Sequence, residues 1–573
     1  MYKILSHIHS TLLRSFCTCI LVNIPRQKNI CPHVIASVEN RSFGNQSVGL
    51  LAKKFKLFCI NRTDCLASLA MTSWTFGLLP IRLKLFIILY SLLTITSPLK
   101  ASDFEINPTI KSAYSEIIKT KLSVGRSILE KDKTRNGFTV YLKSYADLIQ
   151  LLITEDKIFY EQFIDNQVSR LEYLANLDKK SPYLRMLQAE VHLHTAFVKL
   201  KFGHEVKGAW EIIKAYKLLE ANVKEFPDFI PNQKSLGLLH ILIGSTPENY
   251  QWVANLLGLK GNIKQGLAEL QNSIQKDNFW GQESQLIDYL IHAYILSFTT
   301  NKIADFQAFI KQNPNNQLFI FFGITTLMKE GKSEDALNIL ENRKVDKDYL
   351  PFPFLEYLKA EISLQKGQYQ VASKYYQLFL SKYKGFNFVR DTYHKIFLCY
   401  WLNNEDVKAT QFLEKIESVG ENIVESDKVA TKFSANFLAK KPIKPIPQKG
   451  LMKARLAFDG GYYDHALLLI NPYSENSFGN PSDRAELYYR KARIHQKLNN
   501  ITQAIPLFEQ AITLSENQNY SFGASSALQL GYIFQGKNEK QKAKGYFEKA
   551  ISFKKHEYKN SVDNKAKAAL NQL

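Results

Sequence analysis

Residues 485–511 read AELYYRKARIHQKLNNITQAIPLFEQA, and residues 524–550 read ASSALQLGYIFQGKNEKQKAKGYFEKA. The two stretches align without gaps at an offset of 39 residues, so that Phe508 corresponds to Phe547. Similarity at a fixed period of this size is typical of helical repeat arrays, in which each unit buries its apolar face against its neighbours.

Each stretch contains two small residues twelve positions apart, Ala492 and Ala504 in the first and Gly531 and Ala543 in the second. A step of twelve carries the chain from one helix, through a short turn, to the facing position of the next. Two helices that cross closely need small residues at the crossing and larger ones beside it. The pattern therefore predicts a hairpin of two helices in each stretch.

The same step recurs upstream and predicts a series of hairpins. Successive second-helix alanines lie 36 to 39 residues apart, except for a step of 57 that contains KKPIKPIP at residues 440–447, which cannot be helical throughout. The second-helix alanines are Ala336, Ala372, Ala409, Ala466, Ala504 and Ala543, and the matching first-helix positions of the four upstream copies are Ile324, Ala360, Phe397 and Ala454.

These residues resemble the tetratricopeptide repeat, a 34-residue helix–turn–helix unit. The resemblance implies an all-α fold, a solenoid of helical hairpins coiled into a right-handed superhelix. We expect an atypical helical part at its N-terminal end.

A second resemblance lies in residues 236–270, which hold an apolar helix, a proline, a glycine-containing turn and the helix start Gly-Leu-x-x-Leu. This pattern is similar to the tetratricopeptide-repeat-39 family, which includes the fungal inclusion-body clearance proteins. Leu259 and Asn262 stand where that family has Phe and Asp. We expect Gly258 and Gly261 to take positive φ in a sharp turn.

The pattern divides the chain into six segments. They are an extension outside the working protein (1–70), a signal peptide (71–101), helices with degenerate repeats (102–317), tetratricopeptide-like repeats (318–420), a helix with the Lys/Pro-rich insertion (421–450), and C-terminal repeats with a capping tail (451–573).

Residues 71–101 have the pattern of a secretory signal peptide. Arg82 and Lys84 precede eleven uncharged residues, 85–95, and Ala101 offers a small residue for cleavage. The apolar run is shorter than the roughly 20 residues of a membrane span, so we expect no transmembrane span in the mature chain. We therefore expect translation from Met71 and export to the periplasm or the exterior. The alternative is membrane association through an uncleaved signal.

The charge distribution argues against a nucleic-acid partner. The net charge is +21, but residues 1–101 carry twelve Lys or Arg and only two Asp or Glu. The remainder is therefore mildly basic for its size, and its basic residues form no stripe.

Motifs for catalysis, cofactors or metals are not found. Residues 531–538, GYIFQGKN, end in Asn where a phosphate-binding loop needs Ser or Thr, and no strand precedes them. His192 and His194 are two apart, which places them on different faces of a helix. We therefore predict no enzyme activity, no cofactor and no metal.

A protein-binding scaffold is the expected function, because repeat arrays form extended concave surfaces. Two other classes stay open. One is a glycan-binding helical-repeat protein of the starch-utilisation-system D type, which 12% aromatic residues would permit. The other is an enzyme with no recognisable motif.

The resemblance implies that the first helix of each pair lines the groove. One helix stripe and its equivalents in the next repeat form the candidate peptide-binding surface, and its cationic character points to an unknown protein or peptide partner, either acidic or offering a C-terminal carboxylate. These residues are Tyr489, Arg493, Gln496, Lys497, Tyr532 and Gln535.

Overall fold

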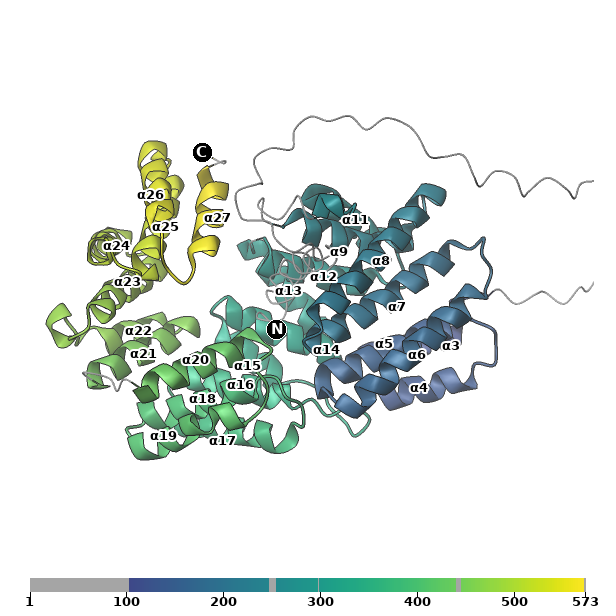
Figure 1. Ribbon diagram of the computed structural model, residues 1–573, viewed down its shortest axis with the longest axis horizontal. Helices are drawn as coiled ribbons and strands as arrows, with labels where there is room; N and C mark the ends of the chain where they lie inside the picture. The colour runs from purple at the N-terminus through teal and green to yellow at the C-terminus, as the bar shows by residue number, and fades with distance from the viewer. Residues whose placement is uncertain (1–102, 247–253, 297, 440–444, 571–572) are drawn as a thin grey trace, which may run out of the picture. The chain divides into compact units, whose positions relative to one another are not determined.

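The computed structural model in Figure 1 describes residues 103–246, 254–296, 298–439, 445–570 and 573. Within these ranges the regular elements are all helices, and the all-α prediction is confirmed. The predicted extension and signal peptide lie outside the described residues. Among the described helices, none combines the length and the apolar character needed to cross a membrane.

The N-terminal part is a succession of helices packed against their sequence neighbours. They are α3 (Pro108–Ile118), α4 (Leu122–Lys131), α5 (Gly137–Thr154), α6 (Lys157–Ala175), α7 (Pro182–Lys201), α8 (Glu205–Glu225), α9 (Gln233–Gly244), α11 (Ile263–Lys276), α12 (Gly281–Tyr294) and α13 (Thr300–Gln312).

The predicted hairpins follow, each made of two helices that pack together. They are α14 (Gln317–Lys329) with α15 (Ser333–Glu341), α16 (Phe354–Gln365) with α17 (Tyr369–Lys382), α18 (Val389–Leu402) with α19 (Asp406–Glu414), α21 (Pro445–Asp459) with α22 (Tyr463–Ile470), α23 (Pro481–Lys497) with α24 (Ile501–Ser515), and α25 (Ser521–Gly536) with α26 (Lys540–Ser552). Helix α20 (Glu425–Ala439) packs on α18 without a hairpin partner of its own, and α27 (Lys559–Leu570) ends the array.

The predicted register is confirmed at every hairpin. All six second-helix alanines are fully buried, and so are the first-helix residues Ile324, Ala360, Phe397, Ala454 and Ala492. A Cβ atom on Gly531 would come within 2.4 Å of the Phe547 ring, which shows how closely the helices cross there.

One turn conformation joins the helices of every predicted hairpin. Five residues before each second-helix alanine, a Gly or Asn takes a left-handed conformation, with φ between +60° at Asn538 and +86° at Gly461. The N–H of the following residue donates to the carbonyl five residues back, as Tyr462 does to Ala457 at 2.9 Å. This is the Schellman motif, which ends a helix and satisfies one of its last carbonyls. The six residues are Gly331, Gly367, Asn404, Gly461, Asn499 and Asn538.

The same unit recurs in the N-terminal part, where the sequence pattern did not identify it. Left-handed Thr120 joins α3 to α4, with Ala113 and Gly125 twelve residues apart. Left-handed Gly203 joins α7 to α8 in the same way, with fully buried Ala196 twelve residues before Gly208. Both copies have a glycine, Gly125 or Gly208, at the position where the other hairpins have the second-helix alanine, so the alanine pattern did not identify them.

The glycines of the second resemblance serve two different purposes. Gly258 has φ +73°, as predicted. The prediction for Gly261 is wrong, because its φ is not positive. Gly261 instead lies against the backbone of Gly244, where a Cβ would be 2.1 Å from the amide nitrogen.

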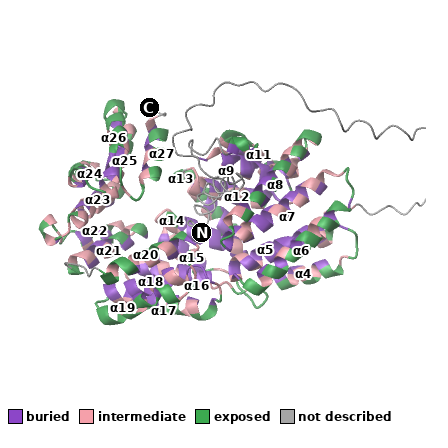
Figure 2. Ribbon diagram, in the orientation of Figure 1, coloured by how far each residue is buried: buried purple, intermediate pink, exposed green. Residues whose placement is uncertain are grey.

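Two boundaries follow from local chemistry. Helix α21 begins at Pro445, inside the Lys/Pro-rich segment, because a proline in the first helical turn gives up no internal hydrogen bond. At the C-terminal end, α27 covers α25 and α26 with buried Val562, Ala566 and Ala569, and Lys567 is exposed on its other side. Lys565 lies at the edge of the buried stripe and is also exposed. Figure 2 shows this division of buried and exposed faces along the helices.

We predict that Gly461→Ala destabilises the protein by about 2 kcal/mol or more, because alanine is strained at this φ and its Cβ would lie 1.7 Å from the Gly331 carbonyl oxygen. The matched control is Gly545→Ala within α26, where no atom lies within 4 Å of the new Cβ and helix propensity improves. Calorimetry should show a lower melting temperature for the first variant only. Equal melting temperatures would contradict the turn geometry.

Candidate functional site

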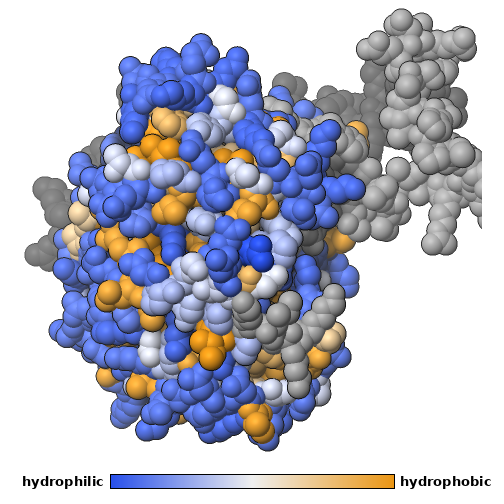
Figure 3. All heavy atoms as spheres, turned by 90° about the vertical axis from the view of Figure 1, so that its left-hand side faces the viewer, coloured by the Kyte–Doolittle hydropathy of each residue, from blue (hydrophilic) through white to orange (hydrophobic). Residues whose placement is uncertain are grey.

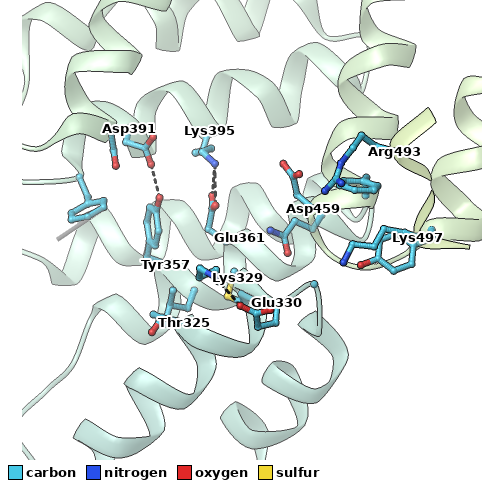
Figure 4. A pocket seen from close by; sticks show the side chains of 18 residues that line it. Thr325, Lys329, Glu330, Tyr357, Glu361, Asp391, Lys395, Asp459, Arg493 and Lys497 are labelled. Atoms are coloured by element: carbon cyan, nitrogen blue, oxygen red, sulfur yellow. Dashed lines mark hydrogen bonds and ion pairs between the residues drawn. The ribbon is translucent and has the colours of Figure 1, made fainter. Parts of the chain in front are cut away.

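A groove of about 530 Å³ is lined mainly by the first helices of the hairpins. Helices α14, α16, α18 and α23 each contribute residues three or four positions apart, such as Asp391 with Lys395 and Arg493 with Lys497, and α21 contributes Phe458 and Asp459 at its C-terminal end. Because the hairpins share one register, the same stripe of each first helix faces the groove. Figure 4 shows these side chains converging from separate helices.

One side of the groove is closed by contact between two hairpin turns far apart in sequence. The Ser333 N–H donates to the Gly460 carbonyl at 3.3 Å, and the Tyr462 hydroxyl donates to Glu334 at 2.8 Å. Gly461 lies so close to Gly331 that a Cβ on Gly461 would be 1.7 Å from the Gly331 carbonyl oxygen, so Gly461 has no room for a side chain. The turns that form the hairpins thus also hold α14 beside α21.

The α16–α18 side of the groove carries a buried acidic network. The Tyr357 hydroxyl donates to Asp391, and the Asp391 N–H donates to Asp427 Oδ1 at 2.9 Å. The Phe388 N–H donates to the other Asp427 oxygen at 2.7 Å, so this carboxyl caps α18 from α20. Burial, with added repulsion from Asp391 and Glu155, raises the pKa of Asp427 to about 7 despite those hydrogen bonds.

The centre of the groove holds an ion pair between neighbouring first helices. Lys395 Nζ lies 2.9 Å from Glu361, which also accepts a hydrogen bond from Tyr376. Burial opposes the charged form of Lys395, but Glu361 and Asp391 outweigh it, and the pKa of Lys395 is raised. These charges satisfy one another and serve to join α16 and α18.

The opposite end of the groove is lined by three cations, Lys329, Arg493 and Lys497, and by two carboxylates, Glu330 and Asp459 (Figure 4). Arg493 donates to Gln496 at 2.7 Å and to Gln529 at 2.5 Å, and its guanidinium lies 5.4 Å from the Phe458 ring centre. Among the described residues Arg493 has no carboxylate partner, and Lys497 has neither a hydrogen bond nor an ion pair. Lys329 enters the same end and pairs with Glu330 at 2.7 Å.

The electrostatics of this end favour an anion. Partial burial lowers the pKa of Lys497, and repulsion from Arg493 and Lys329 lowers it further, against the attraction of Glu330. The pKa of Lys565 on α27 is lowered in the same way, by burial and then by Lys329 and Arg493. An incoming carboxylate would relieve this repulsion.

The structure brings two of the six sequence-predicted site residues, Arg493 and Lys497, into this groove. Gln496 supports Arg493 from the next turn of the helix. Tyr489 instead packs on Phe522, with ring centres 5.7 Å apart, because this face of α23 is turned toward the next hairpin.

The remaining two predicted residues lie on α25 and outside the groove lining. Tyr532 packs edge-on against Phe547 at 5.3 Å, and Gln535 is half-buried near the end of the helix. The lining residues on α14, α16 and α18 were missed. The twelve-residue step identifies the side of each helix that packs against its hairpin partner. No regular pattern in the sequence identifies the side that faces the groove.

The histidine pair lies on two faces of α7. His194 is buried and hydrogen-bonded to Ser144 at 2.8 Å, and burial lowers its pKa well below the usual value. His192 bonds to Glu211 at 2.7 Å. No cluster of metal-ligating side chains is present in the ranges that the structure describes.

A sequence model of the family described as the tetratricopeptide repeat matches residues 485–518 and 524–556, which contain α24 and α26 and most of α23 and α25. The chain contains tetratricopeptide repeats. The matched segments are the two stretches in which the sequence alone gave the clearest register. No curated protein matches this sequence.

Two solved structures are similar over most of their length. The human IFIT1 dimer with PPP-AAAA is 13% identical, with 82% of this chain and 95% of that chain covered and a TM-score of 0.28. The Cut9-Hcn1 hetero-tetramer of APC/C is 13% identical, with 80% and 95% covered and a TM-score of 0.21. At these TM-scores, neither structure bears on what this protein binds.

Proposed function

We propose that this protein is a non-enzymatic scaffold that binds a partner protein through the first-helix groove. Tetratricopeptide repeats imply protein partners. The observation that supports this particular surface is the cationic end of the groove, where Arg493 and Lys497 lack carboxylate partners among the described residues.

The chemistry of that end selects an acidic segment or a free C-terminal carboxylate as the ligand. The guanidinium of Arg493 can form two parallel hydrogen bonds with one carboxylate, and Lys497 can add a second charged donor. Both side chains lie beside a partly buried groove, where charge attraction is stronger than on an open surface. The paired charges of Glu361 and Lys395 satisfy each other and would mark the boundary of the site.

The groove suits a peptide better than a sugar. Its aromatic residues are largely committed to packing, since Tyr357 and Phe388 are less than one-tenth exposed and Phe458 is covered by Arg493. Sugar-binding proteins of the alternative class need aromatic faces open to the ligand. Glu361, Asp391 and Lys395 are engaged in contacts that join α16 and α18, and we assign them a structural role.

We also propose that the protein is exported, on the strength of the signal-like residues 71–101. Figure 3 shows hydrophobic side chains in small groups among hydrophilic ones on one face of the described chain.

We predict that Lys497→Glu weakens binding of acidic peptides at least tenfold, because it places a like charge beside the incoming carboxylate. The measurement is fluorescence anisotropy with Asp- and Glu-rich hexapeptides that carry a free C-terminus, selected on a peptide array. Lys555→Glu is the matched control, since it makes the same charge change at an exposed position outside the groove lining.

Wild-type binding should also weaken as salt concentration rises. Equal affinity of wild type and Lys497→Glu for the selected peptides would rule out this groove. A preference of the array for basic peptides would rule out the proposed ligand class.

For export, we predict that N-terminal sequencing of the protein from its native cell gives a start near Ser102. Cell fractionation should place that product outside the cytoplasm. Cytoplasmic protein that retains residues 1–70 would contradict both the export proposal and the start at Met71.

A further inference from the structure

A second cavity, of about 260 Å³, lies among the helices of the N-terminal part and α14. Its walls are aliphatic and aromatic side chains from α5, α7, α12 and α14, such as Leu148, Ile149, Leu286 and Phe322. Only Lys201 and Glu283 among the lining residues are charged. The cavity is separate from the peptide groove and plays no part in the proposed function.

Both charged lining residues are already neutralised by buried partners. Lys201 Nζ lies 2.6 Å from Glu155, and neither side chain is more than 3% exposed. Glu283 lies 3.4 Å from Lys234 Nζ and accepts a hydrogen bond from the Tyr114 hydroxyl at 3.0 Å. The cavity therefore offers no free charge to a ligand, and whatever fills it is apolar.

Water is a poor occupant of such a space. A buried water needs two to four polar partners, and apolar cavities stay dry. Protein interiors contain few voids larger than a water molecule, because an empty cavity forfeits packing contacts. At about 260 Å³ this space is somewhat smaller than a typical small-molecule pocket and larger than a cavity that holds benzene, so it suits a slender apolar group.

The lining is long enough to hold an extended hydrocarbon chain. The lining follows α5 from Tyr145 to Ile153, which is about 12 Å at 1.5 Å per residue. A dry cavity of about 150 Å³ holds benzene, so this volume takes roughly ten carbon atoms by proportion. Leu152, Leu238 and Leu290 in the lining are only partly buried, and we take this apolar part of the wall as the mouth of the cavity.

We propose that this cavity binds one hydrocarbon chain of a lipid, with the polar head of the lipid outside the mouth. The acyl chain of a free fatty acid and that of a phospholipid share this chemistry. The fatty acid and the phospholipid differ in mass, so mass spectrometry of an organic extract distinguishes them.

The first test is organic extraction of the natively purified full-length protein, followed by mass spectrometry. We expect about one equivalent of a fatty acid or phospholipid, whose mass identifies the source. An extract without lipid, or one in which a peptide is the bound species, would overturn the proposal.

The second test uses 11-(dansylamino)undecanoic acid as a fluorescent probe and dodecanoic acid as the competitor. Ile149→Trp fills the cavity and should reduce probe affinity at least tenfold, with the melting temperature maintained. If Ile149→Trp does not fold, Leu290→Trp at the mouth replaces it and should also reduce probe affinity at least tenfold. The control is Val168→Trp, on the exposed face of α6, which should bind as wild type does. Unchanged probe affinity in a folded cavity variant would overturn the proposal.

Discussion

The rest of the structure depends on one local constraint, a left-handed turn residue followed five positions later by a small residue. The turn residue reverses the chain, and the backbone hydrogen bond across it sets the angle at which the second helix leaves. The small residue then lets that helix cross the first one closely, as at Ala492 and Ala504. Gly and Asn occupy all six predicted turns because they accept positive φ at little cost.

The groove is a consequence of this repetition. Once the crossing side of each first helix is set by a small residue, another side of that helix faces away from its partner. Successive hairpins present that side in the same direction, so Lys395, Glu361 and Arg493 come from three helices but line one groove. The close meeting of Gly331 and Gly461 adds a long-range backbone contact that closes one side of it.

The sequence predicts a part of the fold or of the groove only where packing requires a particular residue type at a fixed spacing. Crossing residues such as Ala336 and Ala543 are predictable, since a close helix crossing requires a small side chain at that fixed spacing. The hairpins at Gly125 and Gly208 were not predicted, because glycine also marks turns. In the site, Arg493 and Lys497 were predictable as a cationic stripe on a first helix. The groove-lining residues on α14, α16 and α18 were not predictable. Their approach to α23 depends on how successive hairpins stack, and the sequence does not show this stacking.

In this account, the first helices of the hairpins bind the peptide, and the second helices pack behind them and hold them in place. Hydrogen exchange measured by mass spectrometry, with and without an acidic peptide selected on the array, tests it most directly. We expect slower exchange on peptide binding in α14, α16, α18, α21 and α23, and unchanged exchange in α15, α17, α19, α22 and α24. Slower exchange confined to the second helices would contradict it.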